Sequence, residues 1–192
     1  MRIDNPDYRH FNGTMVPALL KSVVVDTPVT LVSFTLPPDY VYFVFKIRDY
    51  VPTTDVTGLN LRVSKDNGLT FENGASDYLW VIFKFNTTIQ ANTSDSADAE
   101  ISLIGIGTSI GNAAGEGLNG IVYFYNPGQP SGLRPHFGSS VSWIDSAGLT
   151  TYSEMTSRYG VVGQSVQINA LRFAPSAGNI GTGSIFEMYG IR

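Results

Sequence analysis

Residues 78–85 read YLWVIFKF, and this stretch decides the fold class. Side chains alternate between the two sides of a β-strand, so the stretch has one fully apolar side and one mixed side. The apolar side consists of Leu79, Val81, Phe83 and Phe85. The mixed side consists of Tyr78, Trp80, Ile82 and Lys84. Residues 41–47, VYFVFKI, alternate in the same way, and both stretches therefore predict strands.

Similar short apolar stretches recur along the chain, separated by turn-forming residues. The further strand candidates are residues 21–25, 29–34, 59–64, 100–106, 120–125, 140–145, 164–174 and 184–191. Gly, Pro, Asn, Asp and Ser dominate the segments between them, as in KDNG (65–68) and NPGQPSG (126–132). Residues 15–26 begin like a short helix before a β-branched run, and residues 150–160 are the only other helical candidate. About ten short strands with little helix predict an all-β fold, either an antiparallel β-sandwich or a jelly roll.

The length of the chain sets the domain organisation. A chain of 192 residues can bury one hydrophobic core, so we expect a single β-sandwich domain over residues 19–192. Residues 1–18 fall outside the strand pattern. They are either an arm that attaches the protein to another subunit or a disordered terminus.

Charge and cysteine content limit the partners that the chain can have. The formal net charge is −4, and no run of Lys or Arg is present, so neither nucleic acid nor a membrane surface is an expected partner. Charged residues make up only 15% of the chain, against a usual value of about 25%, which suits a protein that buries surface in an assembly. The chain has no Cys, which excludes disulfides and thiol chemistry and fits assembly in a reducing cytosol. The start of the chain is polar, so we expect no signal peptide.

The sharpest local motif is SKDNGLTF, Ser64–Phe71, which matches the Asp-box hairpin pattern S-x-D-x-G-x-T-[FW]. Asn67 and Gly68 suit a tight turn with positive φ at both positions. The Asp66 carboxylate can accept backbone N–H bonds across such a turn, and Phe71 can pack beneath it. We interpret the motif as structural, with Ser64, Asp66, Asn67, Gly68, Thr70 and Phe71 as its members.

Motifs for catalysis or metal binding are weak. GTSIG (107–111) has the spacing of a nucleophile elbow, but the residues after it cannot sustain the helix that an elbow needs. Asp95, Asp98 and Glu100 lie close in sequence without the spacing of a calcium loop, so a solvated acidic turn is the better interpretation. The two histidines, His10 and His136, have no companion acid or nucleophile at a recognisable spacing. We therefore expect no enzyme activity, no metal and no cofactor.

Aromatic residues leave a second class of function open. The candidates are Trp80, Trp143 and the tyrosines at positions 42, 78, 123, 125 and 152. Burial in the core is the ordinary role of aromatic residues in strands. If Trp80 and Trp143 were exposed instead, they would be able to stack on sugar rings, as in a carbohydrate-binding module.

The chain closes with INALRFAPSAGNIGTGSIFEMYGIR, residues 168–192. Two apolar stretches flank the turn-rich segment 175–183, which predicts an antiparallel hairpin. Leu171 and Phe173 should face the core. On the last strand, either Ile185 and Ile191 or Phe186 and Met188 face it with them.

Two segments carry a resemblance to a known family. Residues 59–80 contain Leu61-Arg62-Val63-Ser64, the Asp box, Gly74-Ala75-Ser76-Asp77-Tyr78 and Trp80. The C-terminal segment, residues 168–192, contains Leu171-Arg172-Phe173, Ser176, Gly178-Asn179-Ile180, Gly183 and Tyr189-Gly190. Together they resemble a β-rich domain that recurs in tailed bacteriophages, at the end of tail-fibre-like proteins or as a small separate virion protein. The resemblance covers about 130 residues, from about residue 59 to the end.

The resemblance implies a structural role and no catalytic residues. It leads us to expect a virion protein, either a capsid decoration or a part of the tail or fibre, that assembles in the host cytoplasm with other virion proteins. We expect a homo-oligomer, with a trimer favoured. Recognition of a host-surface glycan is the alternative function, and it is compatible with a place in the virion.

Overall fold

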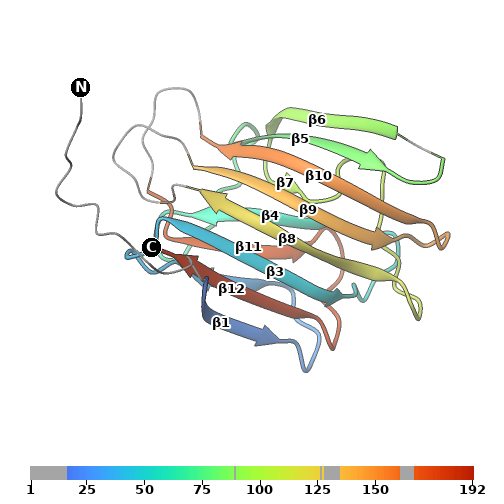
Figure 1. The fold of residues 1–192 in the computed structure, drawn as a ribbon, viewed down its shortest axis with the longest axis horizontal. Coiled ribbons are helices and arrows are strands. Elements are labelled where there is room, and N and C mark those ends of the chain that lie inside the picture. The colour runs from blue at the N-terminus through green and yellow to red at the C-terminus, as the bar shows by residue number, and fades with distance from the viewer. Residues whose placement is uncertain (1–16, 89, 126, 128–134, 161–166) are drawn as a thin grey trace, which may run out of the picture.

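Two antiparallel β-sheets pack face to face in a computed structural model of the chain, which describes residues 17–88, 90–125, 127, 135–160 and 167–192 (Figure 1). The strands are β1 (Ala18–Val24), β2 (Val32–Thr35), β3 (Tyr42–Tyr50), β4 (Leu59–Ser64), β5 (Tyr78–Phe85), β6 (Gln90–Asp98), β7 (Ile101–Ser102), β8 (Gly117–Tyr125), β9 (His136–Ile144), β10 (Thr150–Tyr159), β11 (Ala170–Pro175) and β12 (Ile185–Ile191). The predicted all-β class and antiparallel β-sandwich are confirmed. Nowhere in the described part of the chain is there a helix long and apolar enough to span a membrane.

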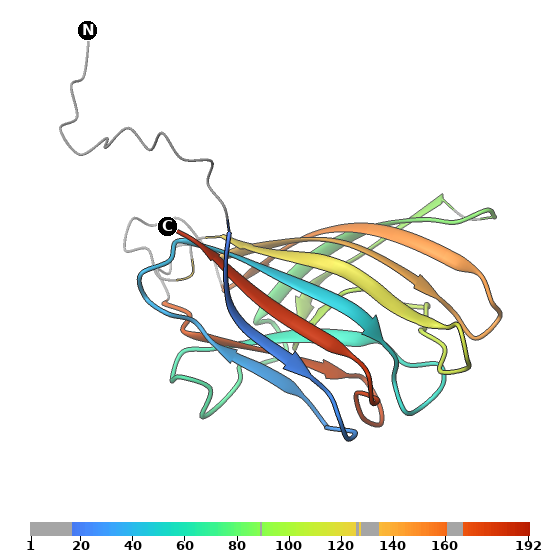
Figure 2. The same cartoon turned by 60° about the horizontal axis from the view of Figure 1, so that its bottom comes forward.

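The two sheets differ in size. The larger sheet has eight strands in the order β1-β12-β3-β8-β9-β10-β5-β6, and the smaller has four in the order β2-β11-β4-β7. Figure 2 shows the larger sheet as the upper layer, with β2, β4 and β11 beneath it. The larger sheet therefore has an inner face that lines the core and an outer face that no described strand covers.

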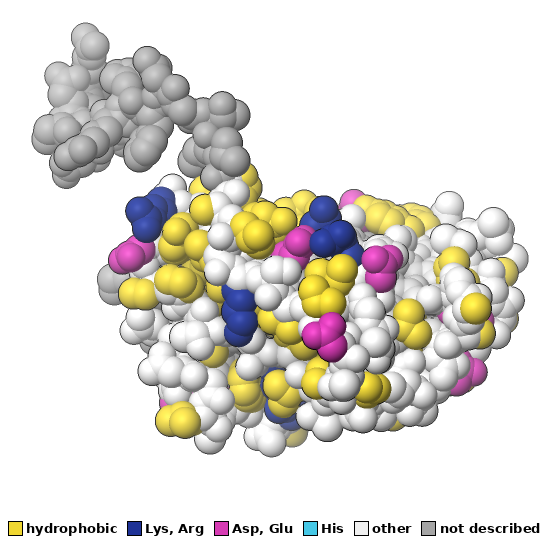
Figure 3. Space-filling view, turned by 90° about the horizontal axis from the view of Figure 1, so that it is seen from below, with side chains coloured by type: hydrophobic (Ala, Val, Ile, Leu, Met, Phe, Trp, Pro, Cys, Tyr) yellow, Lys and Arg dark blue, Asp and Glu magenta, His cyan; other side chains and the backbone are white. Residues whose placement is uncertain are grey.

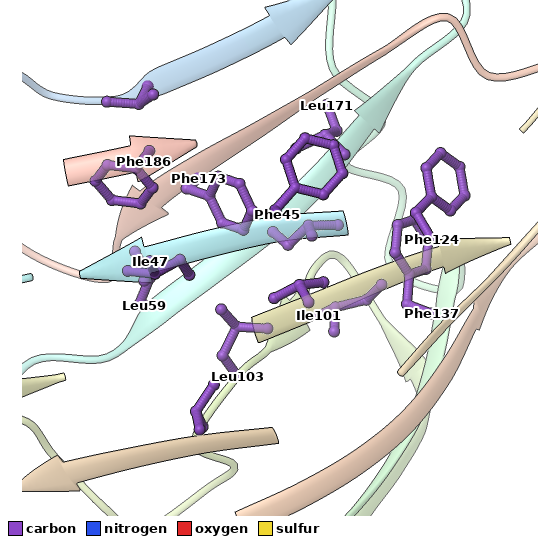
Figure 4. Packing of buried hydrophobic residues seen from close by; sticks show 14 of the residues in the cluster. Phe45, Ile47, Leu59, Ile101, Leu103, Phe124, Phe137, Leu171, Phe173 and Phe186 are labelled. Carbon is purple, nitrogen blue, oxygen red and sulfur yellow. The ribbon is translucent and has the colours of Figure 1, made fainter. Parts of the chain in front are cut away.

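Aromatic rings join the sheets in the core (Figure 4). Phe173 of the smaller sheet lies between Phe45 and Phe186 of the larger sheet, with ring centroids 5.7 and 5.5 Å away. Phe34 on β2 adds an edge contact to Phe45 at 5.4 Å. All four side chains are at most 1% exposed, so they form a dry contact between the layers.

The smaller sheet covers only part of the larger one. The segment after β7 covers the inner side of β5 and β6 instead, where Gly105 lies against Ile82 and Thr93. Lys84, also on the inner side of β5, donates a hydrogen bond from Nζ to the carbonyl oxygen of Ile106 at 3.0 Å. Burial lowers the pKa of this ammonium group.

Strand β5 buries the side that its sequence makes the less apolar one. Tyr78, Trp80, Ile82 and Lys84 point inward and are at most 6% exposed. The apolar side, with Phe83 50% and Phe85 43% exposed, lies on the outer face of the larger sheet. The alternation predicted the strand correctly, but apolar content alone does not identify its buried side.

Three elements differ from expectation. Residues 150–160, a helical candidate, form strand β10, where the small polar residues Thr151, Ser153 and Ser157 at inward positions hide the period of two. Residues 15–26 contain strand β1 from Ala18 onward and no helix among the described positions 17–26. Strand β6 occupies a stretch that reads as a turn, because an edge strand needs few apolar side chains. The expected arm, residues 1–18, lies almost entirely outside the described residues and stays a prediction.

The expected C-terminal hairpin is wrong. Strand β11 pairs with β2 and β4 in the smaller sheet, whereas β12 pairs with β1 and β3 in the larger one. The connecting segment crosses between the layers because its Ile180 is fully buried and bridges to Val29 and Pro52. Leu171 and Phe173 face the core as predicted, and Phe186 and Met188 are the inward residues of β12.

Candidate assembly surface

The outer face of the larger sheet is a continuous, regularly paired surface. One row of paired residues crosses all eight strands, and in sheet order it consists of Ser22, Glu187, Lys46, Ile121, Ser140, Glu154, Phe83 and Asn92. No outward side chain of β3, β8, β9, β10 or β5 is fully buried. The face is therefore available to another molecule.

One half of this face carries exposed apolar side chains. Phe83 and Phe85 project from β5, and the neighbouring Tyr152 on β10 is 38% exposed. The rings of Phe85 and Tyr152 stack with centroids 6.5 Å apart. Shallow grooves follow the seam between β5 and β6 along this patch. Exposed rings side by side on one face are typical of surfaces that bind other proteins.

The other half carries a row of stacked aromatic rings. Tyr42 on β3 stacks on Tyr125 of β8 with centroids 4.7 Å apart, and Tyr125 stacks on His136 of β9 at 4.6 Å. Tyr123 flanks Tyr42 at 6.3 Å. Burial among these rings, with a hydrogen bond to Tyr125, raises the pKa of Tyr42 above its usual value. The stacked tyrosines Tyr42, Tyr123 and Tyr125 stay partly exposed on the outer face.

Few charges interrupt the face. Arg48 pairs with Glu187 at 3.0 Å, toward the end of β3 opposite Tyr42. Lys46 on β3 is exposed, and so is Glu154 on β10, which accepts a hydrogen bond from the Tyr152 hydroxyl at 2.8 Å. Figure 3 looks at the edge of the sandwich on the side where β1 lies, and there too charged side chains are scattered among apolar and uncharged ones. Low charge density favours burial of the surface against a partner.

The Asp-box hairpin forms as its motif predicts. Asp66 Oδ1 accepts hydrogen bonds from Ser64 Oγ at 2.7 Å and from the Thr70 amide at 2.9 Å, and Oδ2 accepts one from Thr70 Oγ1 at 2.6 Å. The bonds from Thr70 are the main cause that lowers the pKa of Asp66 to about 2. Asn67 and Gly68 have φ of 60° and 87°, as expected for the tight turn.

Side-chain contacts join this hairpin to strand β11 and to the residue just before that strand. The Asn67 amide donates to Asn169 Oδ1 at 2.7 Å, and Asn169 lies just before β11. The guanidinium of Arg172 on β11 lies 4.9 Å from the centroid of the Phe71 ring. Phe71 also lies beneath Gly68, 3.8 Å from the position of a Cβ there. These contacts agree with a structural role for the motif.

The two tryptophans do not form a sugar-stacking site. Trp80 is 0% and Trp143 2% exposed, because both project from the inner face of the larger sheet into the core. The Trp80 indole donates from Nε1 to Asp98 Oδ2 at 3.0 Å. The stacking prediction for these two residues is wrong, and burial in the core is their role. Of the tyrosines, Tyr78 is buried too, while those at 42, 123, 125 and 152 lie on the outer face.

The acidic cluster is engaged within the protein. Asp98 accepts bonds from Trp80 and from the Ala99 amide, Asp95 caps the Ala97 amide, and Glu100 pairs with Arg62 at 3.1 Å. Over the described residues, no three His, Asp or Glu side chains are grouped so that they could hold a metal ion. No helix follows residues 107–111, which agrees with their interpretation as a loop.

Comparison with known proteins adds no relative: no protein-family model, no curated protein and no solved structure matches the chain.

The sequence indicated the tyrosines of the outer face only as members of a general list of aromatic residues. Their signal is the period of two in Tyr123 and Tyr125, repeated by Tyr42 across the strand pair. Phe83 and Phe85 gave a misleading signal, since an apolar side normally faces the core of a soluble sandwich. Which side is exposed depends on what covers the sheet, and strand periodicity carries no information about that.

Proposed function

We propose that this chain is a structural protein of a tailed-bacteriophage virion that acts through protein–protein assembly, as a capsid decoration or as a part of the tail or fibre. The observation that carries the proposal is the outward side of β5, where Phe83 and Phe85 stay about half exposed beside Tyr152. Burying such rings against another protein is worth about 1.5–3 kcal/mol for each ring that becomes fully covered. The motif resemblance to phage virion domains supports the same role.

The test is the composition of purified phage particles from cells in which the chain is expressed during particle assembly. We expect the chain in the particles at a fixed stoichiometry, measured by quantitative mass spectrometry, and at a defined position in a cryo-EM map. The matched control is a double variant, Phe83→Ser with Phe85→Ser, whose fold is checked by circular dichroism. Particles that lack the parent chain would overturn the proposed virion role. Particles that incorporate the double variant as well as the parent chain would show that the outward side of β5 is not the assembly surface.

A second candidate function is binding of a host-surface glycan, and the aromatic row favours it. Tyr42, Tyr123 and Tyr125 present ring edges and hydroxyls on the outer face, where they can contact sugar hydroxyls. A glycan array tests this function directly. Binding that is lost in Tyr123→Ala supports it, whereas an array without any bound glycan rejects it.

A further inference from the structure

We propose that the outer face of the larger sheet is a homotypic interface, at which two copies of this chain stack about a two-fold axis. The axis lies in the interface, runs parallel to the strands and passes between β8 and β9. The inference rests on the proposed assembly role and names the partner of the same face. In such an interface, each contact between two different residues occurs twice, once in each direction.

The strand order places this axis at the centre of the sheet. Strands β1, β12, β3 and β8 lie on one side of it, and β9, β10, β5 and β6 on the other. The rotation sets β8 over β9 of the second copy, β3 over β10, β12 over β5 and β1 over β6. All eight strands of each copy then take part, with the sheets about 10 Å apart as in a β-sandwich.

The charges of the face are complementary under this rotation. Lys46 on β3 and Glu154 on β10 lie in the same row and equally far from the axis, with Ile121 and Ser140 between them. Each Lys46 therefore lies opposite Glu154 of the other copy. Within one chain the two residues are three strand spacings apart, about 14 Å, so they do not pair with each other.

The aromatic row is complementary in the same way. Tyr42 and Arg158 occupy equivalent places in the row that contains Tyr125 and His136. The rotation brings the guanidinium of Arg158 over the edge of the stacked rings of the other copy. Arginine on aromatic side chains is a favourable contact once the surrounding water is excluded.

Strand β12 of the second copy would also cover the outward side of β5. The outward side of β12 consists of Ile185, Glu187, Tyr189 and Ile191, and the rows of Tyr189 and Glu187 run unbroken to Val81 and Phe83 on β5. Tyr189 then lies over Val81 of the second copy, and Glu187, which is paired with Arg48, lies over Phe83. Ile185, beyond the irregularity in the β3–β8 pairing, comes next to Phe85 along the groove of the β5–β6 seam. The pairing covers Phe83 with the Glu187 side chain and Phe85 with Ile185, two rings that are 50% and 43% exposed in the single chain.

The test uses charge exchange in the full chain, with mass measured by sedimentation equilibrium over a concentration series. Lys46→Glu sets two carboxylates against each other at both symmetric contacts, and Glu154→Lys sets two ammonium groups there. Each single variant should raise the dimer dissociation constant at least about tenfold. The double variant, and an equimolar mixture of the two single variants, should dimerise again, because both restore opposite charges at both contacts.

A matched control is Asp39→Lys, an exposed charge reversal in the connection between β2 and β3, away from the paired rows. It should leave the dissociation constant unchanged. Lys46→Glu also places a carboxylate opposite Glu187 in its own chain, so thermal melting is recorded for every variant. A lower Tm of the single variants does not explain renewed dimerisation in their mixture, because each chain keeps its own substitution there.

The outcomes separate this inference from the proposed function. A monomeric or trimeric parent chain, or two single variants whose mixture stays dissociated, overturns the two-fold interface. A trimer, expected from the sequence, needs two different surfaces and would not respond to reciprocal exchange. A monomer that is still incorporated into particles refutes the interface and supports the virion role. A dimer that is absent from particles supports the interface and refutes the virion role.

Discussion

Two adjacent residues on β5 give the sharpest test of which side of this strand is buried. Ile82 is fully buried and Phe83 is 50% exposed, although Phe83 belongs to the more apolar side. Ile82→Ala removes core atoms that the neighbours cannot replace, which costs about 2–5 kcal/mol. Phe83→Ala removes a ring that is about half covered. Full burial of Phe is worth about 1.5–3 kcal/mol, so we expect a loss of about 1 kcal/mol.

The assay is thermal and urea unfolding followed by circular dichroism. In a chain of this length, about 1 kcal/mol corresponds to about 2–4 °C in Tm. Ile82→Ala should lower Tm by about 4–20 °C, and Phe83→Ala by about 2–4 °C. Both are measured at several protein concentrations, because dimerisation stabilises the folded chain by mass action. A loss in Phe83→Ala as large as that in Ile82→Ala, persisting at the lowest concentration, would show that the side assignment of β5 is wrong.

Three further predictions concern the turn motif and the last strand. The pKa of Asp66 is lowered to about 2, so its contribution to stability is present above its unfolded pKa of about 4 and is lost as the pH falls toward 2. The Tm difference between the parent chain and Asp66→Asn should therefore shrink across that interval, and a constant difference would contradict it. Gly190→Ala places a Cβ against the Tyr40 ring and the Leu20 side chain, and we expect a loss of about 1–3 kcal/mol in urea unfolding, whereas an unchanged midpoint would contradict this close packing. Deletion of residues 184–192 removes β12, which pairs on both sides, and should abolish the cooperative transition; a soluble variant that still unfolds cooperatively would refute this.

Local sequence predicted the fold class and most strands because alternating apolar residues are a local signal. Strands β3, β4 and β5 begin and end within about one residue of the expected ranges, apart from the longer end of β3. The signal failed at β10, where Thr151, Ser153 and Ser157 occupy inward positions. The buried hydroxyls of Ser153 and Ser157 find no hydrogen-bond partner in the described part of the chain, so small size and not polarity lets these residues fit there.

Pairing between strands was beyond the reach of local sequence. A turn-rich segment between two apolar stretches predicts a hairpin, but residues 175–183 carry the chain from one sheet to the other. The reason is Ile180, an apolar residue within the turn segment that is buried between Val29 and Pro52. Its burial fixes the segment across the layers, so the flanking strands cannot pair with each other.

The distribution of polarity across β5 and β10 carries the argument for assembly. In an isolated antiparallel sandwich the more apolar side of each strand faces the core. Here the inner side includes Lys84 at 6% and Ser153 at 0% exposure, while Phe83 and Phe85 remain open to solvent. Exchanging the two sides of β5 would bury more apolar area in the monomer, so burial of the outer side against a partner would account for the observed arrangement. The proposed second copy, stacked on this face, would cover that side and would place Lys46 opposite the Glu154 carboxylate.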